Sequence, residues 1–384
     1  MLLETLPKML LSWPRARTSP PGRAVPTGWT RTLAFAAAFL FATGLAAPAV
    51  SAKVLRKPPA RAAAKKKARR PVRERPVPVY TRAGLPNIQA RAALILDVTD
   101  GAVARSPLYQ KNPDEVRPIA SISKLMAMLV VLEHKLDLAA KTTITESDAR
   151  LAARGAKSRL LTGMTLTNRD LLYAALLASD NRAVLALGRA VGLSPAEHAA
   201  QMTARARALG LTRTQFMDPT GLDYRNVSTP REVIAFLQAA LKNPLIAQAC
   251  RTTQHTAHAE LAGRSPKQPP RHAAIEYTST DLLLRASKHV IHGGKTGYND
   301  RAGYCLVVAA RLQQASTKPR EVAMAFLGAE GKLTRFADFG RAAQWLVERH
   351  PGLDTKSEPK ADRTTASRTE LPPSSAKAKL PQLL

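Results

Sequence analysis

The chain has few cysteines, few acidic residues and few aromatic residues. Only Cys250 and Cys305 occur in 384 residues, which excludes the dense disulfide framework of small secreted domains. No His/Cys cluster has the spacing of a metal site, so we expect neither a metal nor another cofactor. Because Cys305 lies in the strand-like apolar run "YCLVVAA", two separate buried thiols are favoured over a disulfide.

The shortage of acids leaves the chain strongly basic. It has 58 Lys and Arg against 28 Asp and Glu, a formal net charge of +30. Residues 53–82 account for much of the excess, with 12 basic residues and the single acid Glu74. Since this charge sits in a linker rather than on a folded face, we expect no nucleic-acid partner.

The N-terminal residues have the pattern of an export signal. Basic residues precede an apolar run from Leu33 to Leu45, and small residues follow it up to Ala52. We therefore predict a signal peptide over residues 1–52 and a periplasmic protein. The alternative is an uncleaved membrane anchor, because residues 32–52 match the roughly 20 residues that a spanning helix needs.

Two further segments are predicted to be disordered. Residues 53–85 combine many prolines with repelling positive charges, and residues 351–384 are rich in Pro, Ser, Thr, Ala and Lys. Two interpretations of the basic linker stay open. It is either an electrostatic tether to an anionic membrane or wall polymer, or a solvated spacer that gives reach. The folded domain is expected at residues 86–350.

Strand patterns lie at both ends of this domain. The first is predicted at residues 90–98, with a turn at Asp100–Gly101 and a second strand through Leu108 and Tyr109. Later strands are predicted at residues 292–298, 301–312 and 321–329.

Helix patterns dominate between them. Helices are predicted at residues 167–178, 194–209 and 229–241, each opened by Ser or Thr with an acid three residues later, and an amphipathic helix at residues 333–350 closes the domain. This order indicates one α+β domain whose sheet combines N- and C-terminal segments.

Ser121 and Lys124 open the segment "RPIASISKLMAMLVVLE", which is apolar on every face after the lysine. Such a helix is normally buried, so the lysine would be poorly hydrated. Poor hydration favours the neutral amine, and residues three apart on a helix face the same way. Lys124 could therefore accept the proton of Ser121 and activate it as a nucleophile.

Two more short motifs follow in the chain. Ser179–Asn181 ends the helix predicted at residues 167–178, and Lys295–Gly297 lies on the strand predicted at residues 292–298. Each motif alone is weak. The order Ser-x-x-Lys, Ser-x-Asn, Lys-Thr-Gly, on a helix start, a helix end and a strand, indicates serine acyl transfer.

These motifs and the sequence around them resemble a known family. The matching stretches are "RPIASISKLMAMLVVLE", "SRLLTGMTLTNRDLLYAALLASDNRA", "ARALGLTRTQFMDPTGLDYRNVSTPREV" and "GGKTGYNDRAGYCLVVAA". They are similar to the low-molecular-mass penicillin-binding proteins, serine-type D-alanyl-D-alanine peptidases, and within them to the penicillin-binding protein 7 type of endopeptidase. The resemblance implies a β-lactamase/transpeptidase-like fold, with an antiparallel sheet packed against a helical region.

The resemblance also implies a role for each motif residue. Ser121 would be the nucleophile and Lys124 its general base, while Ser179 and Lys295 would pass a proton to the leaving amine. The substrate-binding residues would be Asn181, Lys295, Thr296, Gly297 and Tyr298, with the N–H groups of Ser121 and Tyr298 as the oxyanion hole. The implied partners are peptidoglycan peptide stems, and β-lactams would act as covalent inhibitors.

Three alternatives to the endopeptidase were considered. A D-alanyl-D-alanine carboxypeptidase differs only in what flanks the scissile bond, and the short sequence after Lys295 favours the endopeptidase. A class A β-lactamase needs a deacylating glutamate in an E-x-x-L-N context. None of the glutamates between Asn181 and Lys295 has that context. An inactive wall-binding module is disfavoured because the motif residues are intact.

Overall fold

The structure is a computed structural model that describes residues 77–99, 107–263, 267–313 and 319–349. The predicted signal peptide, the predicted tail, most of the predicted linker and the turn at Asp100–Gly101 lie outside these residues. Residues 77–85, which the sequence assigned to the linker, form a turn in which the Thr81 N–H donates to the Leu85 carbonyl oxygen at 2.8 Å. The described chain therefore begins before the expected boundary at residue 86.

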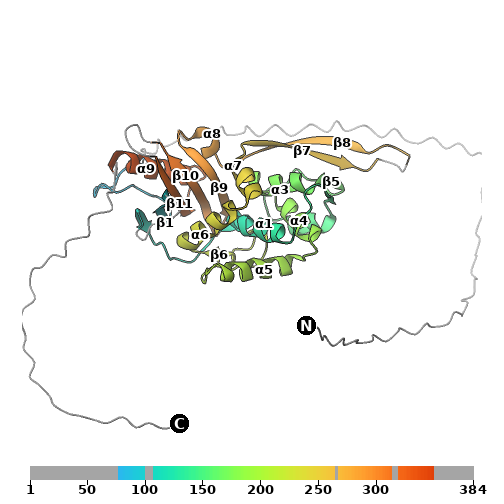
Figure 1. Ribbon diagram of the computed structural model, residues 1–384, viewed down its shortest axis with the longest axis horizontal. Coiled ribbons are helices and arrows are strands. Elements are labelled where there is room, and N and C mark those ends of the chain that lie inside the picture. The colour runs from blue at the N-terminus through green and yellow to red at the C-terminus, as the bar shows by residue number, and fades with distance from the viewer. Residues whose placement is uncertain (1–76, 100–106, 264–266, 314–318, 350–384) are drawn as a thin grey trace, which may run out of the picture. The chain divides into compact units, whose positions relative to one another are not determined.

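An antiparallel five-stranded sheet has the order β2-β1-β11-β10-β9 (Figure 1). Its strands are β1 (Ala92–Asp97), β2 (Tyr109–Lys111), β9 (Val290–Asn299), β10 (Gly303–Leu312) and β11 (Arg320–Ala329). The first strand of the domain pairs with the last, so that Leu94 lies opposite Ala325. This confirms the predicted sheet made from N- and C-terminal segments.

The described residues also form a series of helices, some of which cover the two faces of this sheet. They are η2 (Ala120–Ser123, a 3₁₀ helix), α1 (Lys124–Glu133), α2 (Glu146–Leu151), α3 (Asn168–Leu177), α4 (Asn181–Ala190), α5 (Pro195–Ala208), α6 (Pro230–Leu241), α7 (Pro244–Arg251), α8 (Leu283–Ala286) and α9 (Thr334–Arg349). Helix α9 packs on one face, whereas α6 and α7 pack on the other and connect the sheet to α1 (Figure 1). The four predicted helices are confirmed.

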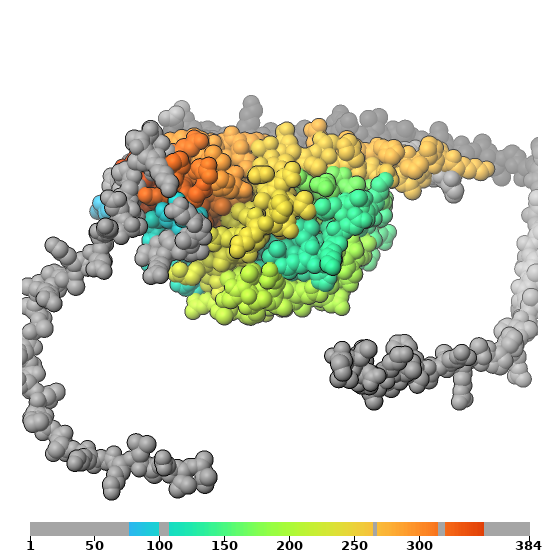
Figure 2. Space-filling view, in the orientation of Figure 1, coloured from blue at the N-terminus to red at the C-terminus, as the bar shows by residue number. Residues whose placement is uncertain are grey.

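A second, four-stranded sheet lies in the middle of the chain, where the sequence predicted helices only. Its order is β4-β5-β7-β8, from β4 (Lys141–Thr143), β5 (Met164–Thr167), β7 (Gln254–Leu261) and β8 (Arg271–Thr278). The β7–β8 hairpin packs against α3, and its end projects past the green helical surface in Figure 2. The prediction missed it because β7 and β8 are rich in Ala, His and Glu and contain Ile275 as their one β-branched aliphatic residue. A two-residue pair, β3 (Arg117–Pro118) with β6 (Val227–Ser228), completes the strands.

The predicted helix caps form, but only one of the acids acts as a capping box. Ser194 accepts from the Glu197 N–H, and the Glu197 carboxylate accepts from the Ser194 N–H. The Asp170 carboxylate instead contacts His255 on β7, and the Glu232 carboxylate bonds into the loop before β6. The acid at the third helical position was thus recruited by tertiary structure in two of the three helices.

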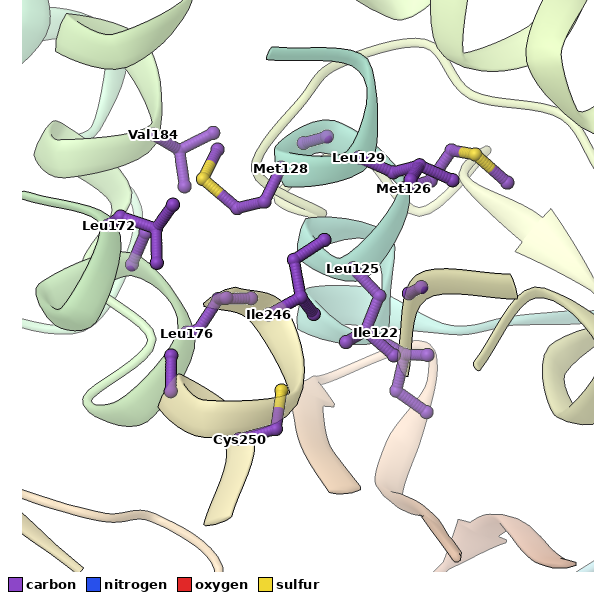
Figure 3. Close-up of a cluster of buried hydrophobic side chains, with 14 of the residues drawn as sticks. Ile122, Leu125, Met126, Met128, Leu129, Leu172, Leu176, Val184, Ile246 and Cys250 are labelled. Carbon is purple, nitrogen blue, oxygen red and sulfur yellow. The ribbon is translucent and has the colours of Figure 1, made fainter. Parts of the chain in front are cut away.

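Two apolar cores flank the five-stranded sheet. The helix-side core surrounds α1, whose side chains meet those of α3, α4 and α7 in Figure 3. The α9-side core lies between the other face of the sheet and α9, and it includes Phe326, Phe339 and Trp345. Apolar residues on every face of α1 are buried, as the sequence predicted.

Both cysteines are buried and free, so the favoured interpretation of two separate thiols holds. Within the described residues no single helix is long and apolar enough to cross a membrane. One helix pair, α6 with α7, passes by length and composition together, but it bends by 110°.

Candidate active site

Ser121 and Lys124 lie where η2 passes into α1. Ser121 is partly exposed, whereas Lys124 is 0% exposed. The Lys124 Nζ lies 2.8 Å from Ser121 Oγ, as the spacing of three residues predicted. The residue before the serine, Ala120, has a φ of +47°, which is uncommon for a side chain other than glycine and marks local backbone strain.

Burial of the Lys124 ammonium is the main cause of a pKa well below the usual value of 10.5. The positive charge of Lys295 lowers it further, while Asp218 and Asp180 oppose the shift. A lysine in this setting favours the neutral amine. A neutral Nζ at hydrogen-bond distance from a serine hydroxyl can take its proton and leave a nucleophilic oxygen.

The loop from Met217 to Asn226 holds this pair in place. The Thr220 carbonyl oxygen accepts from Lys124 Nζ at 2.6 Å, and Asn226 Nδ2 donates to Ser123 Oγ at 3.0 Å. Asp218 shapes the loop, because its Oδ1 accepts from the N–H groups of Thr220 and Gly221. The sequence analysis assigned no role to these residues. The run "DPTG" could have marked a structured turn, but nothing local indicates what it touches.

Ser179 and Asn181 lie at the junction of α3 and α4. Ser179 has a φ of +63°, and Asp180 is the N-cap of α4 rather than the end of α3. Asn181 is 5% exposed, and its Oδ1 has no hydrogen-bond partner among the described residues. Gly155 packs so closely over it that an added Cβ would lie 2.0 Å from Asn181 Nδ2. The Asn181 amide is therefore packed tightly against the loop that contains Gly155.

Lys295–Gly297 lies on β9, which packs against η2. A Cβ at Gly297 would lie 2.6 Å from the Ile119 carbonyl oxygen, so glycine is needed for this close approach. Lys295 is 1% exposed, and burial lowers its pKa to about 8. Cys250 and Asp281 oppose this shift, while Arg335 adds to it.

A hydrogen-bonded chain links the second motif to the third. Thr296 Oγ1 donates to Thr280 Oγ1 at 2.8 Å, and the Thr280 N–H donates to the Leu177 carbonyl oxygen at the end of α3 at 3.0 Å. Lys124 interacts electrostatically with both Lys295 and Asp180. The three motifs therefore surround one centre, at the meeting point of η2, the α3–α4 junction and β9.

Arg335 on α9 fixes the end of β9. Its Nη1 donates to the carbonyl oxygens of Gly297 at 2.9 Å and Cys305 at 3.2 Å, although the side chain is buried. Tyr298 follows on the same strand, is 50% exposed and stacks on Tyr304. The sequence singled out Tyr298 but not Arg335, because an arginine on an amphipathic helix gives no signal of its distant partner.

Asp281 is a second residue that the sequence missed. It is 2% exposed, its Oδ1 accepts from the Leu283 N–H at 3.0 Å, and its Oδ2 has no hydrogen-bond partner in the described part of the chain. Burial raises its pKa to about 6, while the Leu283 N–H, Arg335 and Lys295 oppose the shift. A poorly solvated carboxylate, Asp281, therefore lies near Lys295.

The described ranges hold no group of three or more His, Cys, Asp or Glu residues that could bind a metal ion. The arrangement is a buried lysine against a half-exposed serine, with a second lysine and a buried amide nearby. Chemically it is suited to acyl transfer by serine.

The sequence matches a protein-family model described as D-alanyl-D-alanine carboxypeptidase over residues 79–329, more than half of the chain. The chain belongs to this D-alanyl-D-alanine carboxypeptidase family. The match confirms the resemblance inferred from the motifs, and it includes all three of them.

Two relatives in the family carry the name D-alanyl-D-alanine endopeptidase. The protein from Pseudomonas aeruginosa is 35% identical over 268 residues, which cover 69% of this chain and 80% of the relative. The protein from Escherichia coli is 34% identical over 266 residues, with the same coverage of 69% and 80%.

Solved structures support the same assignment. The structure of the Streptomyces K15 DD-transpeptidase superposes with a TM-score of 0.59 at 27% identity, and the match covers 68% of this chain and 97% of that one. The predicted α+β, transpeptidase-like fold is confirmed.

Proposed function

We propose that the chain is a serine D,D-peptidase that hydrolyses D-alanyl amide bonds of peptidoglycan through an acyl-enzyme. The observation that carries the proposal is the 2.8 Å contact between Ser121 Oγ and the fully buried amine of Lys124. Membership of the D-alanyl-D-alanine carboxypeptidase family supports the substrate class.

In the proposed first step, Lys124 takes the proton of Ser121 as Oγ attacks the carbonyl carbon of the D-alanyl amide. The charge that develops on the carbonyl oxygen is met by the N–H groups of Ser121 and Tyr298. Fixed donors of this kind are worth several kcal/mol because they need no reorganisation during the reaction.

The proton taken up by Lys124 is then passed through Ser179 to the leaving amine, with Lys295 supporting the transfer. The positive charge of Lys295 lowers the pKa of the buried Lys124, so the protonation of one lysine affects that of the other. Their titration accordingly belongs to the coupled pair rather than to either residue. Water finally hydrolyses the acyl-enzyme and regenerates Ser121.

The remaining motif residues bind substrate in this proposal. Asn181 presents an unpartnered Oδ1, which can accept an N–H of the substrate backbone. Thr296 and Lys295 supply a hydroxyl and positive charge for a carboxylate, and Gly297 lets a peptide strand lie close to β9. β-Lactams would acylate Ser121 because their strained amide mimics D-alanyl-D-alanine.

We propose that the preferred substrate is the D-alanyl crosslink between two peptide stems, which makes the protein an endopeptidase. The endopeptidase names of the Pseudomonas and Escherichia relatives support this choice over a carboxypeptidase. A β-lactamase remains disfavoured, because Glu197 is bonded at its helix cap, Glu232 to Thr214 and Glu260 to Lys141.

Digestion of purified muropeptides by the full chain, followed by mass spectrometry, tests the proposal. Conversion of crosslinked dimers to monomers, with pentapeptides kept, is the expected result. Loss of one alanine from pentapeptides with dimers intact would identify a carboxypeptidase instead. Ser121→Ala is the control, and turnover by that variant would exclude Ser121 as the nucleophile.

We further propose that the protein is exported and acts in the periplasm, as its apolar residues 33–45 favour. The basic linker would then hold it on an anionic membrane or wall polymer through charge alone. Co-sedimentation with isolated sacculi and with anionic vesicles should fall when salt is raised and when residues 53–76 are deleted. Binding that survives both changes would favour the simple spacer.

A further inference from the structure

A small pocket opens beside Ser179. It has a volume of about 180 Å³ and is bounded by the loop at residues 156–159, the α3–α4 junction and the end of β8. We call it the Ser179 pocket. Its polar walls come from Lys157, Arg159, Asp180 and Tyr277 as well as from Ser179 itself.

The two basic side chains at this pocket are not neutralised. Lys157 and Arg159 are both exposed, and within the described residues neither forms an ion pair. Arg159 donates to the backbone carbonyl oxygen of Glu276, which holds the guanidinium beside β8 without cancelling its charge. The pocket therefore offers two positive charges on adjacent walls.

The one carboxylate in the walls is already occupied. Asp180 Oδ1 accepts from the N–H groups of Arg182 and Ala183 at the start of α4, and Oδ2 accepts from Ser158 Oγ at 2.6 Å. Its charge is thus offset in part by the helix N-terminus and a hydroxyl, although it still raises the pKa of Tyr277. It does not serve as a counter-ion for Lys157 or Arg159.

Tyr277 adds a donor that lacks an acceptor. The residue is only 4% exposed, and its hydroxyl has no hydrogen-bond partner in the described part of the chain. Burial raises the pKa of this phenol, so the hydroxyl keeps its proton and can only gain by donating it. A buried hydroxyl without a partner is uncommon and costs stability unless a ligand satisfies it.

We propose that the Ser179 pocket binds a carboxylate of the peptide strand that carries the leaving amine. The inference rests on the proposed function, in which Ser179 hands a proton to that amine, so the amine-side strand begins at Ser179. A pocket of about 180 Å³ has room for a carboxylate.

This pocket would distinguish crosslinks from chain ends. Free D-alanine carries one carboxylate, next to its nitrogen, and Thr296 with Lys295 would meet it. A second carboxylate farther along exists only when the amine belongs to another peptide stem. The pocket therefore reads the crosslinked substrate, and it gives a physical reason for endopeptidase preference.

Steady-state kinetics of the full chain test this on two substrates, a crosslinked muropeptide dimer and a pentapeptide monomer, with penicillin acylation measured in parallel. For Lys157→Ala we expect the KM for the dimer to rise about tenfold, as for loss of one charge-assisted contact. Alanine release from the monomer and the acylation rate should stay within about twofold of wild type. Lys332→Ala removes an exposed lysine outside the pocket and is the matched control.

Two further measurements identify the carboxylate. A dimer that is amidated at its amine-side carboxyls except the one next to the scissile nitrogen should show the raised KM with wild-type protein, and Lys157→Ala should add nothing more. Tyr277→Phe should raise the KM for the unmodified dimer less than Lys157→Ala does, without lowering the melting temperature, because no partner of the hydroxyl is lost.

The outcomes separate the two proposals. Wild-type protein that penicillin does not label would refute the proposed function. Labelled protein that leaves dimers intact would overturn the inference about the pocket, as would an equal effect of Lys157→Ala on dimer and monomer. Unchanged kinetics for the amidated dimer would overturn it as well.

Discussion

Asp338 and Asp281 both carry buried carboxylates, but the two differ in how fully their oxygens are hydrogen-bonded. In α9, Asp338 Oδ1 accepts from the Gln89 N–H at 2.8 Å and from Arg341, and Oδ2 accepts from the Ala90 N–H at 2.8 Å. Near Lys295, Asp281 Oδ2 has no partner within the described residues. One carboxylate ties a helix to the residues just before β1, and the other is left with an unpartnered oxygen near Lys295.

The same contrast extends to the two regions around these residues. The α9-side core is built from apolar side chains, whereas the cleft contains Lys124 and Lys295, both with lowered pKa, and Ser179 with a positive φ. Proteins commonly sacrifice stability at active sites in this way. Both cores stabilise the fold, but only the helix-side region also buries two lysines whose pKa values are lowered.

The strongest test of this contrast is to remove the reactive groups. Ser121→Ala should abolish covalent penicillin labelling, and Lys124→Met should slow acylation by about 10²–10⁴, as for loss of a general base. Lys124→Met should also raise the free energy of unfolding, because a buried amine is replaced by an apolar side chain of similar length. Labelling rates and urea denaturation measure the two effects. Acylation by Lys124→Met at the wild-type rate would move the base role to Lys295.

Removing the Asp338 carboxylate should lower the stability of the fold and leave the acylation rate unchanged. Asp338→Ala leaves Arg341 unpaired and frees two backbone N–H groups, so we expect a loss of about 3–5 kcal/mol in the free energy of unfolding. The acylation rate of the protein that remains folded should be unchanged. Loss of acylation without loss of stability would contradict a purely structural role.

Asp281→Asn should give the smallest change in stability, and it should be stabilising. The folded pKa of about 6 lies above the usual carboxyl value of 3.8, so the folded state binds the extra proton between these pH values. Stability therefore falls as pH rises from about 4 to 6, and the penalty is complete above pH 6. A shift of about two pKa units corresponds to a gain on the order of 3 kcal/mol for the asparagine variant at pH 7, vanishing near pH 4.

The same variant should shift the pH dependence of catalysis. The Asp281 carboxylate raises the pKa of Lys295, which stands at about 8, so its loss should lower that pKa. The alkaline limb of the acylation profile should move to lower pH. Stopped-flow acylation between pH 6 and 9 measures it, with Cys305→Ser as a buried control away from Asp281. An alkaline limb at the wild-type pH would show that Asp281 does not influence the pKa of Lys295.

The sequence predicted the parts of the site that local patterns encode. Ser121 and Lys124 were placed on a buried helix because α1 is apolar all round, and Lys295 was placed on a strand by the glycines and apolar run around it. The helix-cap residue Thr167 correctly placed the start of α3, whereas α4 (Asn181–Ala190) was not predicted. These signals are contained in windows of a few residues, so a single sequence carries them.

The missed residues act through partners that are distant in the chain. Asn226 holds Ser123 across 103 positions, and Arg335 reaches Gly297 across 38. Tyr277 and the Ser179 pocket depend on β8, whose residues gave no strong strand signal. Such roles are set by which backbone groups meet after folding, and no local pattern records that.

The pairing of β1 with β11 has a further consequence, for the way the chain is made. Ala92 on β1 can pair only after Leu327 on β11, the central strand, has been made. Strand β9, which carries Lys295, joins the sheet only through β10. Contacts this distant in sequence are slow to form, and synthesis proceeds from the N-terminus. The growing chain therefore contains Ser121 and Lys124 early, but the proposed catalytic centre can be complete only after β11 has been made, so we expect a partly synthesised chain to be inactive.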